Sequence, residues 1–359
     1  MRIAFDIAAL DRGGAERQVL EVASGLHQRD HDVLMVVNKA AKFPEYAGRL
    51  PITELHYNGR YDLRVVAGVR RTLRAFCPDV CVCVSFNASL WGRLAAASLG
   101  CRVVVAEHST RAVPSRSVRL TNTALRGVTE SVIACAEAQI ESLLREGHQR
   151  AKITVVRNGV DAERFTRDDA GAAKVRQELQ IPSKALALGL VAAHRPEKRH
   201  DRFIALLERL DDAGIEAWGV MVGGGPLVSH TVSLARASRV AERLRVTGPR
   251  SDMPAVYSAA DVVVLVSDDV ETFPLCFLEA QACRVPVVGP DIGGVCETMI
   301  PGTTGFVVGR DDLAGMVEVV AALLADRDRR RAMGAAGREL VSHELSRDAM
   351  IDGYERVLA

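Results

Sequence analysis

ADVVVLVSDDVETFPLCFLEAQACRVPVVGPDIGGVCETMIPGTTG, residues 260–305, is the stretch that decides how this chain folds. Residues 261–266 form a valine-rich run, which is typical of a buried parallel strand. Pro274 suits the first turn of a helix, where its missing N–H needs no partner. Residues 285–288 then provide the next strand. Strands that alternate with helices along the whole chain predict parallel sheets in an α/β fold.

Two carboxylates lie between these two strands. Glu271 follows the first strand in a loop, and Glu279 lies eight positions later in the helix. The carboxyl ends of strands and the amino ends of helices share one edge of an open α/β sheet, where ligands usually bind. Backbone amides at that edge attract an anion such as a diphosphate. Carboxylates suit neutral hydroxyls instead, so the two glutamates can reach the ribose and the sugar of one long ligand.

The two glutamates form an E-x7-E pattern that includes Phe273-Pro274 and is followed by P-V-V and GG-x2-E. This pattern resembles the nucleotide-sugar site of retaining glycosyltransferases of family 4, which have the GT-B fold. The resemblance implies that Glu271 lies near the transferred sugar and that Glu279 binds the ribose. It also implies donor contacts at Thr272, Phe273, Pro274 and Leu275. The family usually has a small residue, most often glycine, where this chain has Arg284.

Composition and charge are typical of a soluble globular protein with two domains. The 359 residues are 48% hydrophobic and 25% charged. The net charge of +1 implies no general affinity for nucleic acid, although residues 1–165 carry +6 and residues 166–359 carry −5. No apolar run approaches the ~20 residues of a membrane span. Because Met1 leads straight into a strand, we expect no signal peptide and a cytoplasmic location.

The eight cysteines have no histidine pair at zinc-site spacing, so we expect reduced thiols that are mostly buried.

A glycine turn follows the first expected strand, at Gly13 and Gly14. It does not match G-x-G-x-x-G, which disfavours a dehydrogenase-type dinucleotide fold. The GGAER sequence resembles the N-terminal loop of many family 4 glycosyltransferases. There the two glycines would let the backbone approach the diphosphate or the acceptor. The alternative is a tight turn with only a structural role.

His108 comes directly after the strand expected at residues 102–106. Catalytic groups gather at such strand ends. The position matches the E-H or T-H of the family, where the histidine approaches hydroxyls of the transferred sugar. A hydrogen-bonded structural histidine is the competing interpretation.

Residues 111–126 contain four arginines and no acidic residue, with apolar residues between them. This pattern is typical of a peripheral segment on an anionic membrane surface. Arg111 to Arg126 could instead grip a phosphate of the acceptor, or form a solvated face.

Two motifs of the second half suit a diphosphate. His194 to His200, HRPEKRH, is a cationic loop at the end of an expected strand. It resembles the R-P-E-K phosphate loop of the family, in which Arg195 and Lys198 would neutralise the leaving group. The common family arginine falls where this chain has Ala193.

Residues 223–226 resemble the family's G-x-G-P turn, which packs close to the nucleotide and involves Gly223 and Gly225. Arg250 lies in a loop that contacts the base in relatives.

We therefore expect two Rossmann-like domains that face a cleft: an acceptor domain at residues 1–165 and a donor domain at residues 166–345. The last helix, residues 346–359, should cross back to the first domain. The resemblance implies transfer of a sugar, with retention, from a UDP- or GDP-sugar to a glycan, lipid-linked or small-molecule acceptor. Asp268 and Asp269 suggest a metal motif, but cationic side chains replace the metal in this fold, so we expect no metal and no cofactor. The alternatives are a nucleotide-sugar 2-epimerase and a non-catalytic nucleotide-sugar-binding protein.

Overall fold

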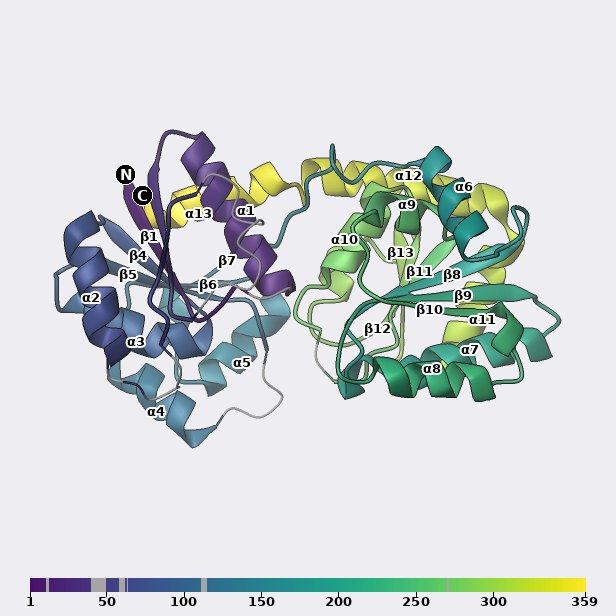
Figure 1. Ribbon diagram of the computed structural model, residues 1–359, viewed down its shortest axis with the longest axis horizontal. Coiled ribbons are helices and arrows are strands. Elements are labelled where there is room, and N and C mark those ends of the chain that lie inside the picture. The colour runs from purple at the N-terminus through teal and green to yellow at the C-terminus, as the bar shows by residue number, and fades with distance from the viewer. Residues whose placement is uncertain (11–12, 40–49, 58–61, 63, 111–114, 270) are drawn as a thin grey trace. The chain divides into compact units, whose positions relative to one another are not determined.

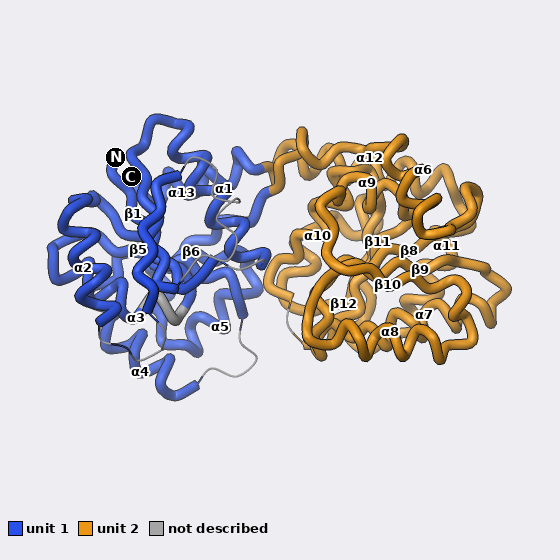
Figure 2. Tube along the Cα trace, viewed as in Figure 1, with its two compact units in different colours: residues 1–159, 347–359 blue, residues 160–346 orange. Residues whose placement is uncertain are grey.

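The computed structural model describes residues 1–10, 13–39, 50–57, 62, 64–110, 115–269 and 271–359, without the side chains of residues 86–89. The chain divides into two compact units, as Figure 2 shows. The first unit is Met1–Gly159 with Arg347–Ala359, and the second is Val160–Ser346. Each unit is built on one parallel sheet with helices on both faces (Figure 1).

The first boundary between the units falls six residues before the position expected from the sequence. Val160 forms a parallel bridge with Ser346. Phe165 packs edge-on against Tyr257, with 6.4 Å between the ring centroids. Because these partners belong to the second unit, residues 160–165 belong there as well.

The sheet of the first unit has seven strands in the order β3-β2-β1-β4-β5-β6-β7. The strands are β1 (Arg2–Ile7), β2 (Asp32–Val37), β3 (Ile52–Glu54), β4 (Val80–Val84), β5 (Arg102–Glu107), β6 (Ser131–Ala134) and β7 (Ile153–Val155). The α-helices are α1 (Gly14–Gln28), α2 (Arg64–Phe76), α3 (Ser85–Ala97), α4 (Arg116–Ala124), α5 (Ile140–Arg145) and α13 (Arg347–Leu358). Ser85 follows β4 directly, has a φ of 59° and begins α3.

The core of the first unit lies on both faces of its sheet. Phe5 of β1 packs on one face in a cluster with Leu26 of α1 and Ile351 of α13. Ala4 of the same strand packs on the other face with Val69 of α2. The alternation follows the two-residue period of a strand, so a sheet covered on both faces favours apolar residues at successive positions.

The sheet of the second unit has six strands in the order β10-β9-β8-β11-β12-β13. The strands are β8 (Leu186–Val191), β9 (Ala217–Val222), β10 (Leu244–Thr247), β11 (Val262–Val264), β12 (Val287–Pro290) and β13 (Gly305–Val308). The α-helices are α6 (Asp169–Glu178), α7 (His200–Asp212), α8 (Val228–Ala237), α9 (Met253–Ser258), α10 (Leu275–Ala282), α11 (Leu313–Ala325) and α12 (Arg327–His343). The strand order reverses between β8 and β11, and at such a point ligands bind in open α/β sheets.

All eight cysteines are free. Four are buried, but Cys77 and Cys296 are exposed, so burial does not extend to every thiol.

Candidate functional site

Four loops meet at the carboxyl edge of the second sheet, following β9, β8, β11 and β12. Gly223, after β9, has a φ of 154°, and a Cβ on it would lie 2.0 Å from the carbonyl oxygen of Ala192 after β8. A Cβ on Gly225 would lie 2.6 Å from the carbonyl oxygen of His194. The close approach of the two loops therefore requires glycine at these positions.

The loop after β8 rests on two stacked histidines. The rings of His194 and His200 lie 4.0 Å apart, and Nδ1 of His194 is 3.0 Å from Oγ1 of Thr231. Burial, followed by the nearby His194, lowers the pKa of His200 to about 4. His200 is therefore neutral at pH 7. The stack supports a short 3₁₀ turn at Pro196–Lys198, which leaves the Arg195 side chain exposed.

Lys198 and Glu271 form an ion pair at the point where the strand order reverses. The Nζ atom of Lys198 donates to Oε1 of Glu271 at 2.5 Å, and Oγ of Ser267 donates to the same oxygen at 2.6 Å. Glu271 is 6% exposed, whereas the Lys198 side chain is 20% exposed. The strand order thus places a buried carboxylate beside a more accessible ammonium group.

The loop after β12 fixes the backbone of Glu271. The N–H of Gly294 donates to the carbonyl oxygen of Glu271 at 3.0 Å. Gly293 has a φ of 50°, and a Cβ there would lie 2.0 Å from that same oxygen. The glycine turn predicted from the sequence therefore positions the catalytic candidate.

The two aspartates before Glu271 contact arginines. Asp268 pairs with Arg199 at 2.7 Å, and Asp269 pairs with Arg310 at 3.5 Å. Arg199 also pairs with Asp201 at 2.7 Å. Within the described ranges, no group of three His, Cys, Asp or Glu side chains is arranged to hold a metal ion. Binding of the donor without a metal remains a prediction.

Glu279 lies on α10, and its side chain is buried. Its Oε2 atom accepts a 2.5 Å hydrogen bond from the hydroxyl of Tyr257, which fixes the orientation of the carboxylate. Desolvation, followed by the charges of Glu271 and Glu279, raises the pKa of the Cys276 thiol. The charges of both glutamates therefore affect the Cys276 thiol, at the start of α10.

The other donor candidates on this loop differ in access. Phe273 and Pro274 are buried, whereas Thr272 and Leu275 are partly exposed. Of these four residues, the last two are therefore the more accessible.

Arg250 lies after β10 and is held by two carboxylates. Its guanidinium group makes two bonds to Glu178, of 2.7 and 2.8 Å, and pairs with Asp252 at 2.8 Å. A Cβ on Gly224 would lie 3.1 Å from Cγ of Pro249, so the loop that carries Arg250 adjoins the loop after β9. Arg250 thus lies beside the loop after β9 with its charge already paired, and its contact with the base stays a prediction.

Gly13, Gly14 and His108 belong to the first unit. A Cβ on Gly13 would lie 2.0 Å from a carboxylate oxygen of Glu16, so that carboxylate lies against the glycine turn.

His108 is partly exposed after β5, and its Nε2 atom is 3.2 Å from the hydroxyl of Tyr354 on α13. The Nδ1 atom of its ring is nevertheless buried, and this desolvation lowers the pKa of His108 to about 4. A neutral imidazole at pH 7 can exchange hydrogen bonds with hydroxyls without carrying charge.

The arginine-rich segment is described from Ser115 onward, and residues 111–114 lie outside the described residues. Arg116, Arg119 and Arg126 are exposed, and Leu120 beside them is 70% exposed. In the described part of the chain, no helix is both long and apolar enough to cross a membrane.

Sequence reasoning missed two residues that hold the glutamates, Ser267 and Tyr257. Ser267 lies four residues before Glu271, so its spacing within the motif is a usable signal. Tyr257 lies on a different helix, 22 residues before Glu279, and no periodicity connects the two.

The chain matches two families of known proteins. Residues 12–164 match Glycosyltransferase Family 4, and residues 172–340 match Glycosyl transferases group 1. Among curated relatives, a GDP-mannose-dependent alpha-(1-6)-phosphatidylinositol monomannoside mannosyltransferase of Mycobacterium tuberculosis is 35% identical over 204 residues, which are 54% of this chain and 52% of the relative. A D-inositol 3-phosphate glycosyltransferase of Salinispora tropica is 34% identical over 227 residues, covering 58% and 47%. The chain thus spans about half the length of these relatives.

Solved structures match over almost the full length of the chain. A glycosyltransferase of Rickettsia africae has a TM-score of 0.88 at 19% identity and covers 99% of this chain and 97% of its own. HepE of Anabaena, solved in complex with UDP-glucose, has a TM-score of 0.87 at 19% identity and covers 100% and 99%. At this identity the likeness shows the fold alone. The two family matches, which follow each other along the chain, show that the chain belongs to glycosyltransferase family 4. The solved structures show that it has the GT-B fold.

Proposed function

We propose that this protein transfers a sugar from a nucleotide-sugar donor to a hydroxyl of an acceptor, with retention of the anomeric configuration. The observation that supports this most is the Lys198–Glu271 pair at the reversal of strand order. A nucleotide sugar presents a diphosphate next to sugar hydroxyls. The pair offers the complementary groups, an ammonium and a carboxylate, at one point.

Catalysis in this proposal is electrostatic. The diphosphate draws Lys198 from Glu271 and is further neutralised by Arg195 and by the amides at the amino end of α10. Glu271 then accepts hydrogen bonds from the hydroxyls of the transferred sugar, and Glu279 accepts them from the ribose. The acceptor hydroxyl attacks from the face of the leaving group, and the departing phosphate takes its proton. The diphosphate is already an activated leaving group, so the proposal includes no cofactor.

The names of the relatives suggest which donors and acceptors to try. The Mycobacterium tuberculosis relative is named as GDP-mannose-dependent, and the Anabaena structure was solved with UDP-glucose. We therefore propose a GDP- or UDP-sugar as donor, with GDP-mannose tested first. For a lipid-linked acceptor, we propose that Leu120 and the arginines of α4 contact an anionic membrane surface.

The first experiment is a thermal-shift screen of GDP-, UDP- and ADP-sugars with and without EDTA. Stabilisation by one nucleotide class that persists in EDTA supports a metal-free donor site and identifies the base. Absence of a shift at millimolar donor would contradict the proposal. A shift that requires added divalent metal would make Asp268 and Asp269 the residues to test next.

Glu279→Gln, with Glu318→Gln on the exposed face of α11 as control, tests the ribose contact. Weaker donor binding is expected only in Glu279→Gln. Release of free sugar or transfer to an acceptor distinguishes an enzyme from a protein that only binds the donor.

A further inference from the structure

A second polar site lies on the amino edge of the second sheet, where the strands begin. An open cavity of about 910 Å³ is formed by α6, by the residues that precede β8, β11 and β12, and by the start of α12. The donor loops lie at the opposite ends of the same strands. Six arginines line the cavity: Arg167, Arg176, Arg284, Arg327, Arg330 and Arg331.

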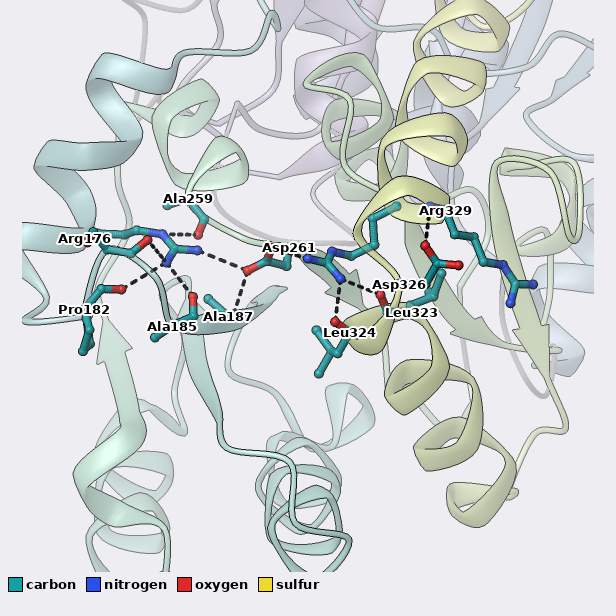
Figure 3. Close-up of polar contacts among 12 residues, drawn as sticks. Arg176, Pro182, Ala185, Ala187, Ala259, Asp261, Leu323, Leu324, Asp326 and Arg329 are labelled. Atoms are coloured by element: carbon teal, nitrogen blue, oxygen red, sulfur yellow. Dashed lines mark hydrogen bonds and ion pairs between the residues drawn. The ribbon is translucent and has the colours of Figure 1, made fainter.

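Two of the arginines are fixed to the wall through Asp261, as Figure 3 shows for Arg176. Arg176 and Arg330 approach the two carboxylate oxygens of Asp261 at 3.2 and 3.3 Å. Arg176 also donates to the carbonyl oxygens of Ala185 and Ala259, and Arg330 donates to those of Leu323 and Leu324. Asp261 is therefore shared between two cations, and both guanidinium groups are fixed by several contacts to the wall.

Three of the arginines lack such partners. Arg284, Arg327 and Arg331 are exposed, and their side chains have no hydrogen bond or ion pair with any residue that the structure describes. Arg327 and Arg331 are four residues apart, which places them on one face of α12.

The charge of the cavity contrasts with that of its unit. Residues 160–346 contain 22 Lys and Arg against 27 Asp and Glu, whereas the cavity wall has six arginines and two aspartates. Like charges gathered in one concave site repel each other and attract an anion.

Arg284 is held in place by its backbone. Its φ is 62°, in the left-handed region that disfavours side chains with a Cβ. A Cβ on Gly334 of α12 would lie 2.1 Å from the carbonyl oxygen of Arg284, so this turn is pressed against the helix that carries Arg327 and Arg331. The three unpartnered arginines thus come from two elements in direct contact.

We propose that this cavity binds the phosphate groups of an anionic ligand, at a site separate from the donor site. The planar guanidinium fork binds phosphate in a bidentate manner, and the volume lies within the range of small-molecule pockets. The phosphates could belong to a soluble phosphorylated metabolite or to a lipid headgroup.

The test uses inorganic diphosphate in titration calorimetry at physiological salt. Lys198→Ala is the background, because it weakens binding of diphosphate at the donor loops. We expect the Arg284→Gly/Arg331→Ala change to lower the diphosphate affinity of this background at least tenfold. The charge-matched pair Arg209→Ala/Arg236→Ala, exposed on α7 and α8, should leave the affinity within twofold. Glycine readily adopts the left-handed conformation of residue 284. The single variant Arg284→Gly therefore removes the side chain without straining the turn, and a loss of binding in it is not a loss of folding.

Cosedimentation with vesicles that contain phosphatidic acid distinguishes the two sources. Binding to free diphosphate identifies a soluble ligand, and arginine-dependent binding to vesicles alone identifies a headgroup. Binding of neither probe, or equal losses in the cavity and control variants, would overturn the proposal.

Discussion

The strand order reverses in a similar way in both units, but the side chains at the two reversals differ. The first unit has a buried carboxyl group there, and the second has an ion pair. In the first unit the reversal lies between β1 and β4, and Asp6 of β1 is completely buried beside it. A Cβ on Gly92 of α3 would lie 2.1 Å from Oδ2 of Asp6, so the helix packs directly on the carboxyl group. In the second unit the reversal carries the Lys198–Glu271 ion pair, in loops beyond the strand ends.

The difference shows that topology alone does not make a charged ligand site. Burial raises the pKa of Asp6 to about 8, so this carboxyl group is neutral at pH 7 and acts as part of the packing. Lys198 and Glu271 instead form an ion pair, in which the lysine side chain is 20% exposed. The predictions below test this contrast.

The largest effect on activity is expected from the Lys198–Glu271 ion pair at the reversal of strand order in the second unit. Lys198→Ala removes the cation that faces the departing diphosphate, and we expect kcat/KM for sugar transfer to fall about 10²–10³-fold. Arg236→Ala, on the exposed surface of α8, is the control and should be neutral. Steady-state kinetics measure both variants. A Lys198→Ala enzyme that retains more than a tenth of the activity would exclude a main role for this lysine.

The neutral carboxyl group of Asp6, at the reversal of strand order in the first unit, should make the stability of that unit depend on pH. The folded-state pKa of Asp6 is raised, so its stabilising contribution is complete below the ordinary value near 4 and is lost as pH rises through 8. Relative to Asp6→Asn, the free energy of unfolding of the wild-type first unit should therefore fall by about 3 kcal/mol between pH 5.5 and pH 9. Asp6→Asn keeps the shape of the side chain and cannot ionise.

The two tryptophans allow each unit to be read separately in this experiment. Trp91 lies in the first unit and Trp218 in the second. Denaturant unfolding of Trp218→Phe protein follows the first unit, and unfolding of Trp91→Phe protein follows the second as the control. If the unfolding free energy of the first unit has the same pH dependence with Asp6 and with Asp6→Asn, the carboxyl group is not held neutral.

A smaller effect is expected from the glycine that positions Glu271. Gly293→Ala combines a positive φ with a Cβ 2.0 Å from the Glu271 carbonyl oxygen, and it should destabilise the second unit by about 2–3 kcal/mol. Gly100 of the first unit also has a positive φ, of 70°, but nothing lies within 4 Å of its Cβ position. Gly100→Ala should therefore cost only about 1 kcal/mol of backbone strain. Equal losses in the two variants would argue against a tight contact at Glu271.

Local patterns predicted the second unit well because its site is compact in sequence. The valine run, Pro274 and the glycine turn of residues 260–305 each report a local conformation, and β11, α10 and β12 form where these signals occur. The family resemblance supplied the roles of Glu271 and Glu279, which spacing alone did not.

Contacts between distant segments had no such signal. Tyr257 reaches Glu279 from another helix, and Gly92 meets Asp6 across 86 positions of the chain. The arginine-lined cavity is built from four separate segments, so its charge becomes visible only after folding. From the sequence, Arg284 was only a departure from a family pattern.

The smallest effect on stability is expected at Arg284. This residue lies at the amino edge of the second sheet, whereas Glu271 and Gly293 lie at its carboxyl edge. Glycine removes the strain of the left-handed conformation, about 1 kcal/mol, but gains a similar freedom in the unfolded chain. Arg284→Gly should therefore change the free energy of unfolding by less than about 1 kcal/mol. Unfolding of Trp91→Phe protein with and without the change measures this difference. A loss above 2 kcal/mol would mean that Arg284 holds the fold together, whereas a small change leaves its side chain available for an anion.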